Sequence, residues 1–568
     1  MLSSDLIQRI LPVLLLLPVG VAILLRFLQG NLARQAALGF AILQFVLMAV
    51  VGLGALEGVA GNPENVTQNR AGDSPNLAKF NAGPVFFPRF VPGDPGVEHP
   101  TNTTTWTILP LAKSADKSVG VQLFIGLDGI NMWMLLLASF IFVSVVLFSW
   151  DAIEEQPAQY YSWLFLLYAG VLGVFLSFDL VLFYIFFELT LIPLLFLIGN
   201  WGPGPKRRDA AWKLFLYTLA GGLITLVGIV SLVMFTYQKT GELTTSIPRL
   251  IVLGQKIVAS SSPDQFTSWL HTENLIFLAL AAGFVVKIPL IPVHTWLPGA
   301  YTEAPTGVTV MMSALLAKMG IFGFLRILLP LTPHAAINLG VPLLGTFAAV
   351  GILYGAFCAL MSTDIRRIIA YSSISHLGFC VLGILSFNEA GLAGGILHMV
   401  NHGLSTGALF LLVGLVIRRY MTANLPDMGG IWKRLPTLTF FFMVAALASV
   451  GLPGLNNFIS EMLMLAGVIN IRSSHVSGFA FAGIACAGIF LGAWYTLSLV
   501  KNLFFGPLKE PGNVEVKDLT TRERCAVIPL LVMCVILGVF PQLVLDSMKA
   551  DVDSLSHLAM TTRLQLAR

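Results

Sequence analysis

The sequence is poor in charged residues and in cysteine. Only 11% of its 568 residues are charged, whereas about a quarter are charged in a typical soluble protein. The five cysteines form no CxxC pair, which argues against the common iron–sulfur and zinc sites, and neither a Walker loop nor a GxGxxG fingerprint occurs. We therefore predict that this chain binds no metal and no cofactor. Lysine and arginine (33) barely exceed aspartate and glutamate (29), so no nucleic-acid partner is indicated either.

Long apolar segments make up most of the remaining sequence. Hydrophobic residues account for 56% of the chain, and the mean hydropathy is +0.83. The apolar runs are about 20 residues long, the length that an α-helix needs to cross a bilayer, whereas barrel strands would be shorter and alternating. We predict an all-α polytopic membrane protein with about fourteen transmembrane helices, numbered as spans in chain order. The predicted spans are residues 8–28, 36–59, 122–149, 160–178, 179–200, 212–236, 273–295, 304–330, 337–362, 367–386, 390–417, 436–470, 477–505 and 524–547.

Two of the predicted spans contain helix-breaking residues. Pro289 and Pro292 follow Lys287 in span 7, and the stretch Gly451–Gly454 (GLPG) interrupts span 12. Proline removes a backbone donor and clashes with the preceding turn, so we expect both helices to be broken inside the membrane. Broken helices at corresponding places in two halves point to an ion pathway. We therefore predict that spans 4–8 and spans 9–13 form two inverted five-helix repeats.

The predicted organisation divides the chain at its longest loop and at the repeat boundaries. The loop is rich in Pro, Gly, Asn and Thr and lacks a helical period, and its sequons at Asn65 and Asn102 are weak matches. The predicted units are 1–59 (first two transmembrane helices), 60–120 (external irregular loop), 121–159 (third helix), 160–330 (first five-helix repeat), 337–505 (second five-helix repeat) and 506–568 (last helix and short tail).

Lysine and arginine are concentrated in the loops that follow odd-numbered spans, for example at 206–208, 366–367 and 418–419. By the positive-inside rule these loops face the cytoplasm, so both termini are predicted to lie on the non-cytoplasmic side. The first apolar run lacks an A-x-A-type cleavage site and is predicted to be retained as a helix. Such a clear bias is typical of a protein of the bacterial inner membrane.

Four ionisable residues lie deep inside apolar spans, namely Glu188, Lys287, Lys318 and Glu461. Each charge at the bilayer centre costs about 2.5–3.5 kcal/mol, so the four together cost roughly 10–14 kcal/mol. Burial disfavours the charged form of both residue types, whereas a Glu–Lys pair restores it. A lysine whose partner moves away therefore tends to release its proton. We predict that these residues carry protons.

Each of these residues also has a structural interpretation. Lys318 could reach an interface by snorkelling, and Lys287 could be solvated by the carbonyls that the helix break frees. Glu461 could cap amides at the break in span 12, whereas Glu188 lies too far from either end of its span to be an edge carboxylate. Arg326, close to the end of span 8, is predicted to snorkel to the interface.

Histidines extend this group of residues. His376 lies in span 10, and His398 and His402 are four residues apart on one face of span 11. Imidazole titrates near neutral pH and passes a proton through its two nitrogens. We predict that His376 and His402 belong to the proton path, with His398 and His294 as secondary members, although a buried histidine is also often a plain core residue. A metal site is not predicted, because no third ligand stands at a suitable spacing.

Six segments, taken in order between about Tyr160 and Phe540, resemble one family of membrane proteins. They are FFELTLIPLLFLIGNWG, KIPLIPVHTWLPGAYTEAPT, LLAKMGIFGFLR, DIRRIIAYSSISHLGF, NHGLSTGALFLLVG and GLPGLNNFISEMLML. Together they are similar to the antiporter-like membrane subunits of proton-pumping NADH:quinone oxidoreductase (respiratory complex I), above all to the M-type (subunit 4) chains. His398 lies outside the pattern of that family.

The resemblance implies a proton-translocating subunit of a membrane arm, with L-type and N-type antiporter-like chains as partners. NADH, flavin, iron–sulfur clusters and quinone would be bound by other subunits. The matching residues are the glutamate of helix 5 (Glu188), the lysine of broken helix 7 that pairs with it (Lys287), the helix 8 lysine (Lys318), the polar residues of helices 10 and 11 (His376, His402) and the terminal acidic residue of broken helix 12 (Glu461).

Two related functions are kept as alternatives. The chain also resembles the Mrp-type Na⁺/H⁺ antiporter subunits and the M-like subunits of membrane-bound hydrogenases. The L-type, N-type and Mrp-type chains typically carry lysine at the position of Glu461, so this residue argues against them. The hydrogenase subunits share most of the quoted motifs.

Overall fold

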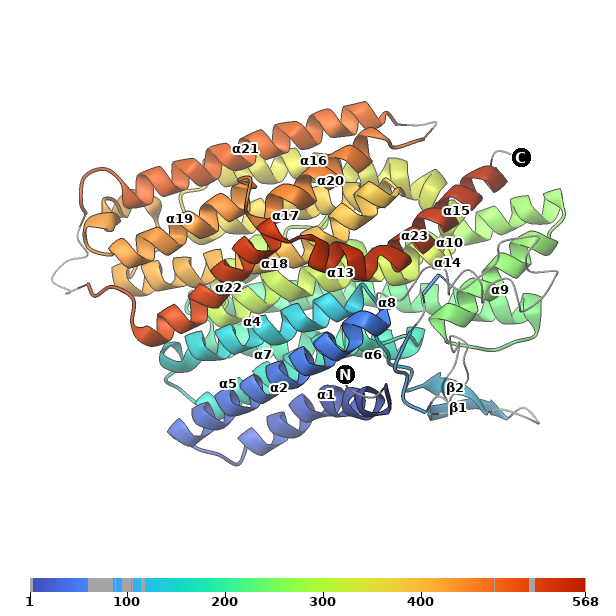
Figure 1. Ribbon diagram of the computed structural model, residues 1–568, viewed down its shortest axis with the longest axis horizontal. Helices are drawn as coiled ribbons and strands as arrows, with labels where there is room; N and C mark the ends of the chain where they lie inside the picture. Colours follow the sequence, from blue (N-terminus) through green and yellow to red (C-terminus); the bar gives the residue numbers. More distant parts are fainter. Residues whose placement is uncertain are drawn as a thin grey trace.

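The computed structural model describes residues 4–59, 85–86, 88–93, 104, 106–113, 118–473, 476–509 and 516–566. Most of its helices lie roughly parallel or antiparallel to one another in a bundle, with a two-stranded sheet at one end (Figure 1). Most of the predicted loop 60–120, including Asn65 and Asn102, lies outside the described residues.

The bundle is assembled from long helices and several shorter helical segments, three of which are π-helical turns (η1 to η3). The bounds are α1 Ser4–Leu25, α2 Gly30–Val59, β1 Thr107–Lys113, β2 Ser118–Gln122, α4 Asn131–Ala152, α5 Pro157–Leu176, α6 Leu180–Leu189, α7 Leu191–Trp201, α8 Arg207–Thr240, α9 Ile247–Ser260, α10 Pro263–Lys287, α11 Leu297–Glu303, α12 Thr306–Met311, η1 Met312–Leu316, α13 Ala317–Gly323, η2 Phe324–Leu328, α14 Leu329–Leu331, α15 Pro333–Ala335, η3 Ala336–Gly340, α16 Val341–Met361, α17 Ile365–Leu385, α18 Glu389–Tyr420, η4 Leu425–Asp427, η5 Ile431–Lys433, α19 Pro436–Val450, α20 Asn456–Ile469, α21 Gly478–Phe504, α22 Thr521–Val539 and α23 Gln542–Leu566.

Within the described residues, twelve helices or helix runs are long and apolar enough to cross a membrane, or thirteen if the bent pair α22–α23 counts as one span. This confirms the prediction of an all-α polytopic membrane protein. Span 12 is broken as expected, because α19 ends at Val450 and α20 begins only at Asn456, after the GLPG stretch. Span 7 is also broken, since α10 ends at Lys287 and a turn leads to α11. The grouping into two inverted repeats stays a prediction.

Several boundaries differ from the predictions. Span 3 begins at Asn131 instead of 122, because the preceding residues include strand β2 and its connection to the helix. Strand β1 pairs with β2 in antiparallel fashion, so part of the segment predicted as irregular is a hairpin. Span 14 ends at Val539 near Pro541, which has no N–H to continue a helix. The helix α23, which lies at 66° to α22, replaces the predicted short tail.

The predicted span 8, which runs from α12 through η1, α13 and η2 to α14, lies at the centre of the bundle (Figure 1). Its apolar window is 100% buried inside the protein, compared with 39% for α1 and 33% for α2. Charged residues of this span therefore face protein and cannot reach lipid. Two π-helical turns, η1 and η2, flank α13; such turns insert an extra residue and occur frequently at functional sites.

The prediction that Arg326 snorkels is wrong. Arg326 is 1% exposed and forms an ion pair with Asp128, which precedes α4. Its guanidinium lies over the rings of Phe86, Phe178 and Phe322, at 4.3, 4.4 and 4.9 Å from the ring centroids. Arg326 stays inside because an acidic partner and three aromatic faces replace water.

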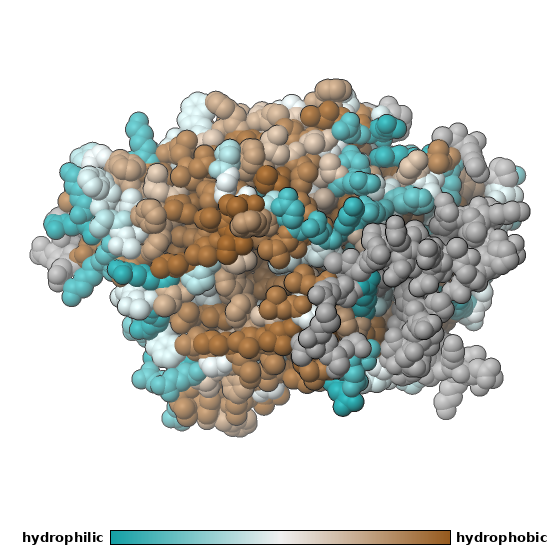
Figure 2. All heavy atoms as spheres, viewed as in Figure 1, coloured by the Kyte–Doolittle hydropathy of each residue, from teal (hydrophilic) through white to brown (hydrophobic). Residues whose placement is uncertain are grey.

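The outer surface of the bundle is apolar around its middle. In Figure 2, hydrophobic side chains cover the centre of the face shown, and hydrophilic side chains gather toward its ends. Large apolar side chains are exposed on outward faces, for example Leu223 and Val227 on α8 and Phe490 and Trp494 on α21. A belt of this kind fits contact with lipid or with other membrane subunits.

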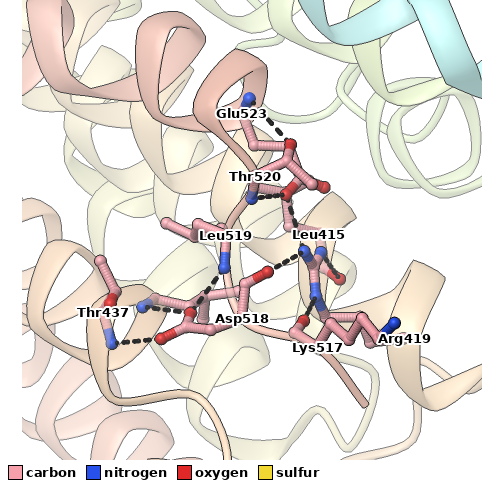
Figure 3. A network of polar contacts seen from close by, with 9 residues as sticks. Leu415, Arg419, Thr437, Lys517, Asp518, Leu519, Thr520 and Glu523 are labelled. Carbon is pink, nitrogen blue, oxygen red and sulfur yellow. Dashed lines mark hydrogen bonds and ion pairs between the residues drawn. The ribbon is translucent and has the colours of Figure 1, made fainter. Parts of the chain in front are cut away.

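A polar network fixes the first half of broken span 12 at one end of the bundle (Figure 3). The carboxylate of Asp518 accepts hydrogen bonds from the backbone of Thr437 (2.8 Å) and Leu438 (3.1 Å), in the first turn of α19. Burial alone would raise the pKa of Asp518, but its hydrogen bonds, first those from Thr437, hold that pKa below its ordinary value. Arg419 at the end of α18 pairs with Glu523 at 2.7 Å, so α18, α19 and α22 are joined.

Candidate functional site

Lys318 lies at the middle of the central helix and makes two short contacts. It is 0% exposed, and its Nζ donates to the carbonyl of Ser313 at 2.5 Å, a residue of the π-helical turn η1. Nζ also lies 2.7 Å from Nδ1 of His402 on α18. An ammonium group only donates, so Nδ1 accepts and the neutral imidazole carries its proton on Nε2. A proton on Lys318 therefore faces a base across a short hydrogen bond.

Three histidines and one glutamate continue from this contact. The ring centroids of His376 and His402 are 5.4 Å apart, and His398 lies 5.7 Å from His402 and 5.8 Å from His376. His376 Nδ1 lies 3.6 Å from Oε1 of Glu461. Lys318, His402, His376 and Glu461 are thus successive neighbours from the central helix to broken span 12.

Buried amides hold the break of span 12 against α18. Asn401 donates to the backbone carbonyl of Asn456 at 2.7 Å, and Asn456 donates to that of Asn401 at 2.9 Å. Both side chains are 0% exposed. Ser460, one turn further along α20, contacts Nδ1 of His398 at 3.0 Å. These bonds fix the start of α20, and hence Glu461, relative to the histidines.

Glu461 points back toward the helix break. A Cβ built on Gly451, whose φ is +77°, would lie 2.5 Å from Oε2 of Glu461. The position therefore requires glycine both for its backbone conformation and for the space that the carboxylate occupies. Within the part of the chain that the structure describes, this carboxylate accepts no hydrogen bond from the amides of the break. That disfavours the interpretation of Glu461 as a helix cap.

Lys287 lies at the end of α10 and contacts the middle of span 5. Its Nζ donates to the carbonyl of Phe187 at 2.7 Å and to Oγ1 of Thr190 at 3.1 Å, and lies 3.5 Å from the ring centroid of Phe187. Thr190 is the residue between α6 and α7, where span 5 is interrupted. The carbonyl that solvates Lys287 comes from this neighbouring helix and not from the break that follows the lysine.

The sequence predicts that Glu188 pairs with Lys287, but the two side chains are not in contact in the structure. Both carboxylate oxygens of Glu188 are buried, and neither has a hydrogen-bond partner among the described residues. They lie against Gly222 of α8, where a Cβ would come within 2.0 Å of Oε1. The predicted pair is therefore present without direct contact. Lys287 bonds to the backbone next to the glutamate, and the carboxylate interacts with it electrostatically but has no hydrogen-bond partner among the described residues.

The structure brings most, but not all, of the predicted site residues together. Lys318, His402, His376 and Glu461 form one contact series, and His398 joins it through both other rings. His294 lies elsewhere, with its ring 4.9 Å from that of Tyr354.

Some buried polar residues were not predicted as parts of a site. Glu273 is 0% exposed and accepts hydrogen bonds from the backbone of His334 (2.9 Å) and Ala335 (3.2 Å). The ring of His334 in turn contacts Gln565 of α23 at 2.9 Å. Glu273 was placed at the edge of span 7, but α10 begins at Pro263, so the residue is nearly three turns inside the helix. Because the residues before Glu273 are mostly polar, the hydropathy pattern does not reveal that the helix already begins at Pro263.

The arrangement is suited to moving protons. A lysine, neutral imidazoles and a carboxylate all bind and release protons, and each faces the next within the buried core. Among the described residues, no group of three or more His, Cys, Asp or Glu side chains could hold a metal ion. The groups are 2.7 and 3.6 Å apart at the two ends of the series, and the two ring centroids between them are 5.4 Å apart, so each proton-binding group has a neighbour that can accept its proton.

Sequence comparisons identify relatives over most of the chain. Residues 177–487 match the family model described as NADH:quinone oxidoreductase/Mrp antiporter, TM. The chain is 38% identical over 432 residues to NADH-quinone oxidoreductase subunit M of Rhodobacter capsulatus, covering 75% of this chain and 81% of that protein. It is 37% identical over 433 residues to subunit M of Pseudomonas aeruginosa, with the same coverage of both chains.

Solved structures share the fold. A chain of respiratory complex I from Thermus thermophilus with bound NADH is similar with a TM-score of 0.76 and 26% identity, covering 97% of this chain and 99% of that one. A chain of the Mrp complex from Dietzia sp. DQ12-45-1b reaches a TM-score of 0.74 at 19% identity and full coverage of both chains, which shows a common fold.

Proposed function

This chain belongs to the NADH:quinone oxidoreductase/Mrp antiporter family of membrane subunits, and we propose that it is the M-type proton-translocating subunit in the membrane arm of an NADH:quinone oxidoreductase. The observation that carries the proposal is the buried series Lys318–His402–His376–Glu461, with a 2.7 Å contact at its start and a 3.6 Å contact at its end. The relatives named subunit M and the complex I structure support the assignment to this complex.

In this function the chain moves protons and other subunits supply the energy. NADH oxidation and quinone reduction take place in subunits that hold flavin and iron–sulfur clusters, and this chain contributes no redox centre. A membrane potential of 100 mV opposes each outward proton by about 2.3 kcal/mol, so pumping needs that external drive. The signal reaches this chain as a change of charge next to its buried groups.

The contacts support the following order of events. When Lys287 moves between Phe187 and Glu188, the field at Lys318 changes, because an ammonium group is displaced inside a medium of low dielectric constant. Lys318 then passes its proton to Nδ1 of His402, and His376 relays it to Glu461.

Location and partners follow from the same assignment. The subunit lies in a bacterial inner membrane beside L-type and N-type antiporter-like chains, and both termini lie on the non-cytoplasmic side. The lysine- and arginine-rich loops support this orientation. Glu461, where L-type, N-type and Mrp-type chains typically carry lysine, supports the assignment to the M-type chain.

Affinity purification of the tagged chain in mild detergent tests the assignment. We expect flavin and iron–sulfur subunits to co-purify and the isolated complex to oxidise NADH with reduction of quinone. Co-purification of small membrane subunits alone, without redox activity, would contradict the proposal and favour an Mrp-type antiporter. A nickel-containing partner would contradict it in favour of a membrane-bound hydrogenase.

A Gly222→Ala substitution tests whether the position of Glu188 matters. The added Cβ would lie 2.0 Å from Oε1, so the flexible carboxylate must turn away while the helix packing changes little. We expect a several-fold loss of proton pumping per NADH oxidised, with normal assembly. Gly351→Ala on α16 is the matched control, because a Cβ there meets no atom within 4 Å. Equal pumping by the two variants would refute the role given to this pocket.

A further inference from the structure

We propose that Thr190 and the carbonyl of Phe187 form a second docking position for Lys287, which competes with Glu188 for its ammonium group. Thr190 is then a positioning residue for the charge switch. The consequence for pumping rests on the proposed function, whereas the docking position itself is carried by the geometry of span 5 and α10.

The docking position is made by one turn of span 5. The hydroxyl of Thr190 donates to the carbonyl of Phe187 at 2.9 Å, and its oxygen accepts from Nζ of Lys287 at 3.1 Å. The same Nζ donates to the Phe187 carbonyl at 2.7 Å. The Thr190 hydroxyl, the Phe187 carbonyl and Nζ of Lys287 are therefore all hydrogen-bonded to one another. Thr190 is 0% exposed, so these bonds are shielded from bulk solvent.

The face of Phe187 completes the position. Nζ of Lys287 lies 3.5 Å from the ring centroid, within the range of a cation–π interaction. Phe187 and Thr190 are three residues apart and so lie on the same side of the helix. The ring, the carbonyl and the hydroxyl thus approach the ammonium group together.

Glu188 offers a competing site that the lysine does not occupy. Successive residues on an α-helix point about 100° apart, so Glu188 points away from the side that holds Phe187 and Thr190. Its oxygens are buried beside Gly222 and have no hydrogen-bond partner among the described residues. Lys287 can therefore contact either the docking position or the carboxylate, and the structure shows the first of these two arrangements.

A lysine with two defined positions makes a two-state switch. Without a docking position, a buried ammonium group would have Glu188 as its strongest partner and would stay there. The hydroxyl of Thr190 and the Phe187 carbonyl lower the cost of leaving the carboxylate. A small change of charge nearby is then sufficient to shift the balance between the two positions.

The test compares Thr190→Val, which keeps the shape but removes the hydroxyl, with Thr190→Ser, which keeps it. Thr190→Val removes a hydrogen bond to a charged group. We therefore expect the population of Lys287 at the docking position, relative to the population paired with Glu188, to fall about tenfold in this variant. An unpaired buried carboxyl is neutral and a paired one is ionised. Infrared difference spectroscopy of the purified complex therefore reports this ratio through the carboxyl C=O band that Glu188→Gln removes.

Two controls separate positioning from structure. Thr236→Val on α8 removes a buried hydroxyl bonded to the Leu232 carbonyl at 2.8 Å, with no lysine among its hydrogen-bond partners. It should leave the infrared band and the pumping unchanged. In a Lys287→Met background, Thr190→Val should produce no further change in pumping, since its effect passes through the lysine.

Three results are expected. The neutral-carboxyl infrared band is smaller in Thr190→Val than in the wild type, and it recovers in Thr190→Ser. In the Lys287→Met background, Thr190→Val no longer changes pumping. An unchanged band in an assembled Thr190→Val complex would overturn the inference, as would an equal change in Thr236→Val. If the complex lacked NADH:quinone activity, the proposed function would fail, but the infrared comparison would still decide whether Thr190 holds Lys287.

Discussion

The Glu188→Gln variant is expected to assemble normally and to lose most of its redox-coupled proton pumping. Glutamine has nearly the same shape as glutamate, and the pocket beside Gly222 accommodates it. No hydrogen bond among the described residues is lost, because the Glu188 oxygens make none. Glutamine cannot ionise when Lys287 approaches, so the lysine has no charged partner to draw it away from Phe187 and Thr190. Pumping per NADH oxidised, measured in liposomes with a pH-sensitive dye, reports the result.

The control for this experiment is the amount of complex that assembles. If Glu188→Gln reached normal levels of NADH:quinone activity and still pumped fully, the central role of the carboxylate would be refuted. Glu188→Asp offers a graded comparison, since it keeps the charge but shortens the side chain. We expect this variant to pump less than the wild type and more than Glu188→Gln.

The second large effect concerns folding. Arg326→Met should strongly reduce the amount of assembled subunit, because it removes the direct ion-pair partner of the buried Asp128. Removing one partner of a buried ion pair costs about 3–5 kcal/mol, a large fraction of the stability of a typical domain. The three phenyl rings around the guanidinium also lose their cation. Thermal unfolding of the purified complex and the yield of subunit from membranes measure this effect.

A double substitution distinguishes charge from packing. In Arg326→Met with Asp128→Asn, neither charge is left buried alone, so stability should recover in part relative to Arg326→Met. An equal or larger loss in the double variant would contradict this account and indicate that packing against the rings dominates. Proton pumping by whatever complex assembles is expected to be normal, since Arg326 lies outside the contact series of Lys318.

The sequence could predict the residues that carry charge into the membrane, because such residues stand out against apolar surroundings. It could also predict the breaks after Lys287 and around Gly451–Gly454, since proline and glycine act locally. The sequence itself indicated His376, His402 and Glu461, the family resemblance matched them to known positions, and the structure places them in one series. Their functional roles stay predictions.

What the sequence could not show are contacts between distant segments. Asp128 lies near the start of predicted span 3, and nothing near Arg326 in the chain reveals that the two meet. The same limit applies to Lys287, whose acceptor is the backbone of Phe187, a carbonyl that every residue possesses. Thr190 would have required knowledge of which face of span 5 meets α10. Each of these features depends on tertiary packing, which periodicity does not report.

The complete burial of the central helix constrains the order in which the protein is built. The segment Thr306–Leu331 carries Lys318 and Arg326 and would meet lipid on every side if it entered the bilayer alone. Each cation would then cost about 2.5–3.5 kcal/mol. Asp128 is synthesised earlier and is ready to neutralise Arg326, but His402 emerges from the ribosome about 80 residues after Lys318. During biogenesis Lys318 must therefore stay beside the earlier helices or at the insertion machinery until α18 is inserted and His402 can contact it.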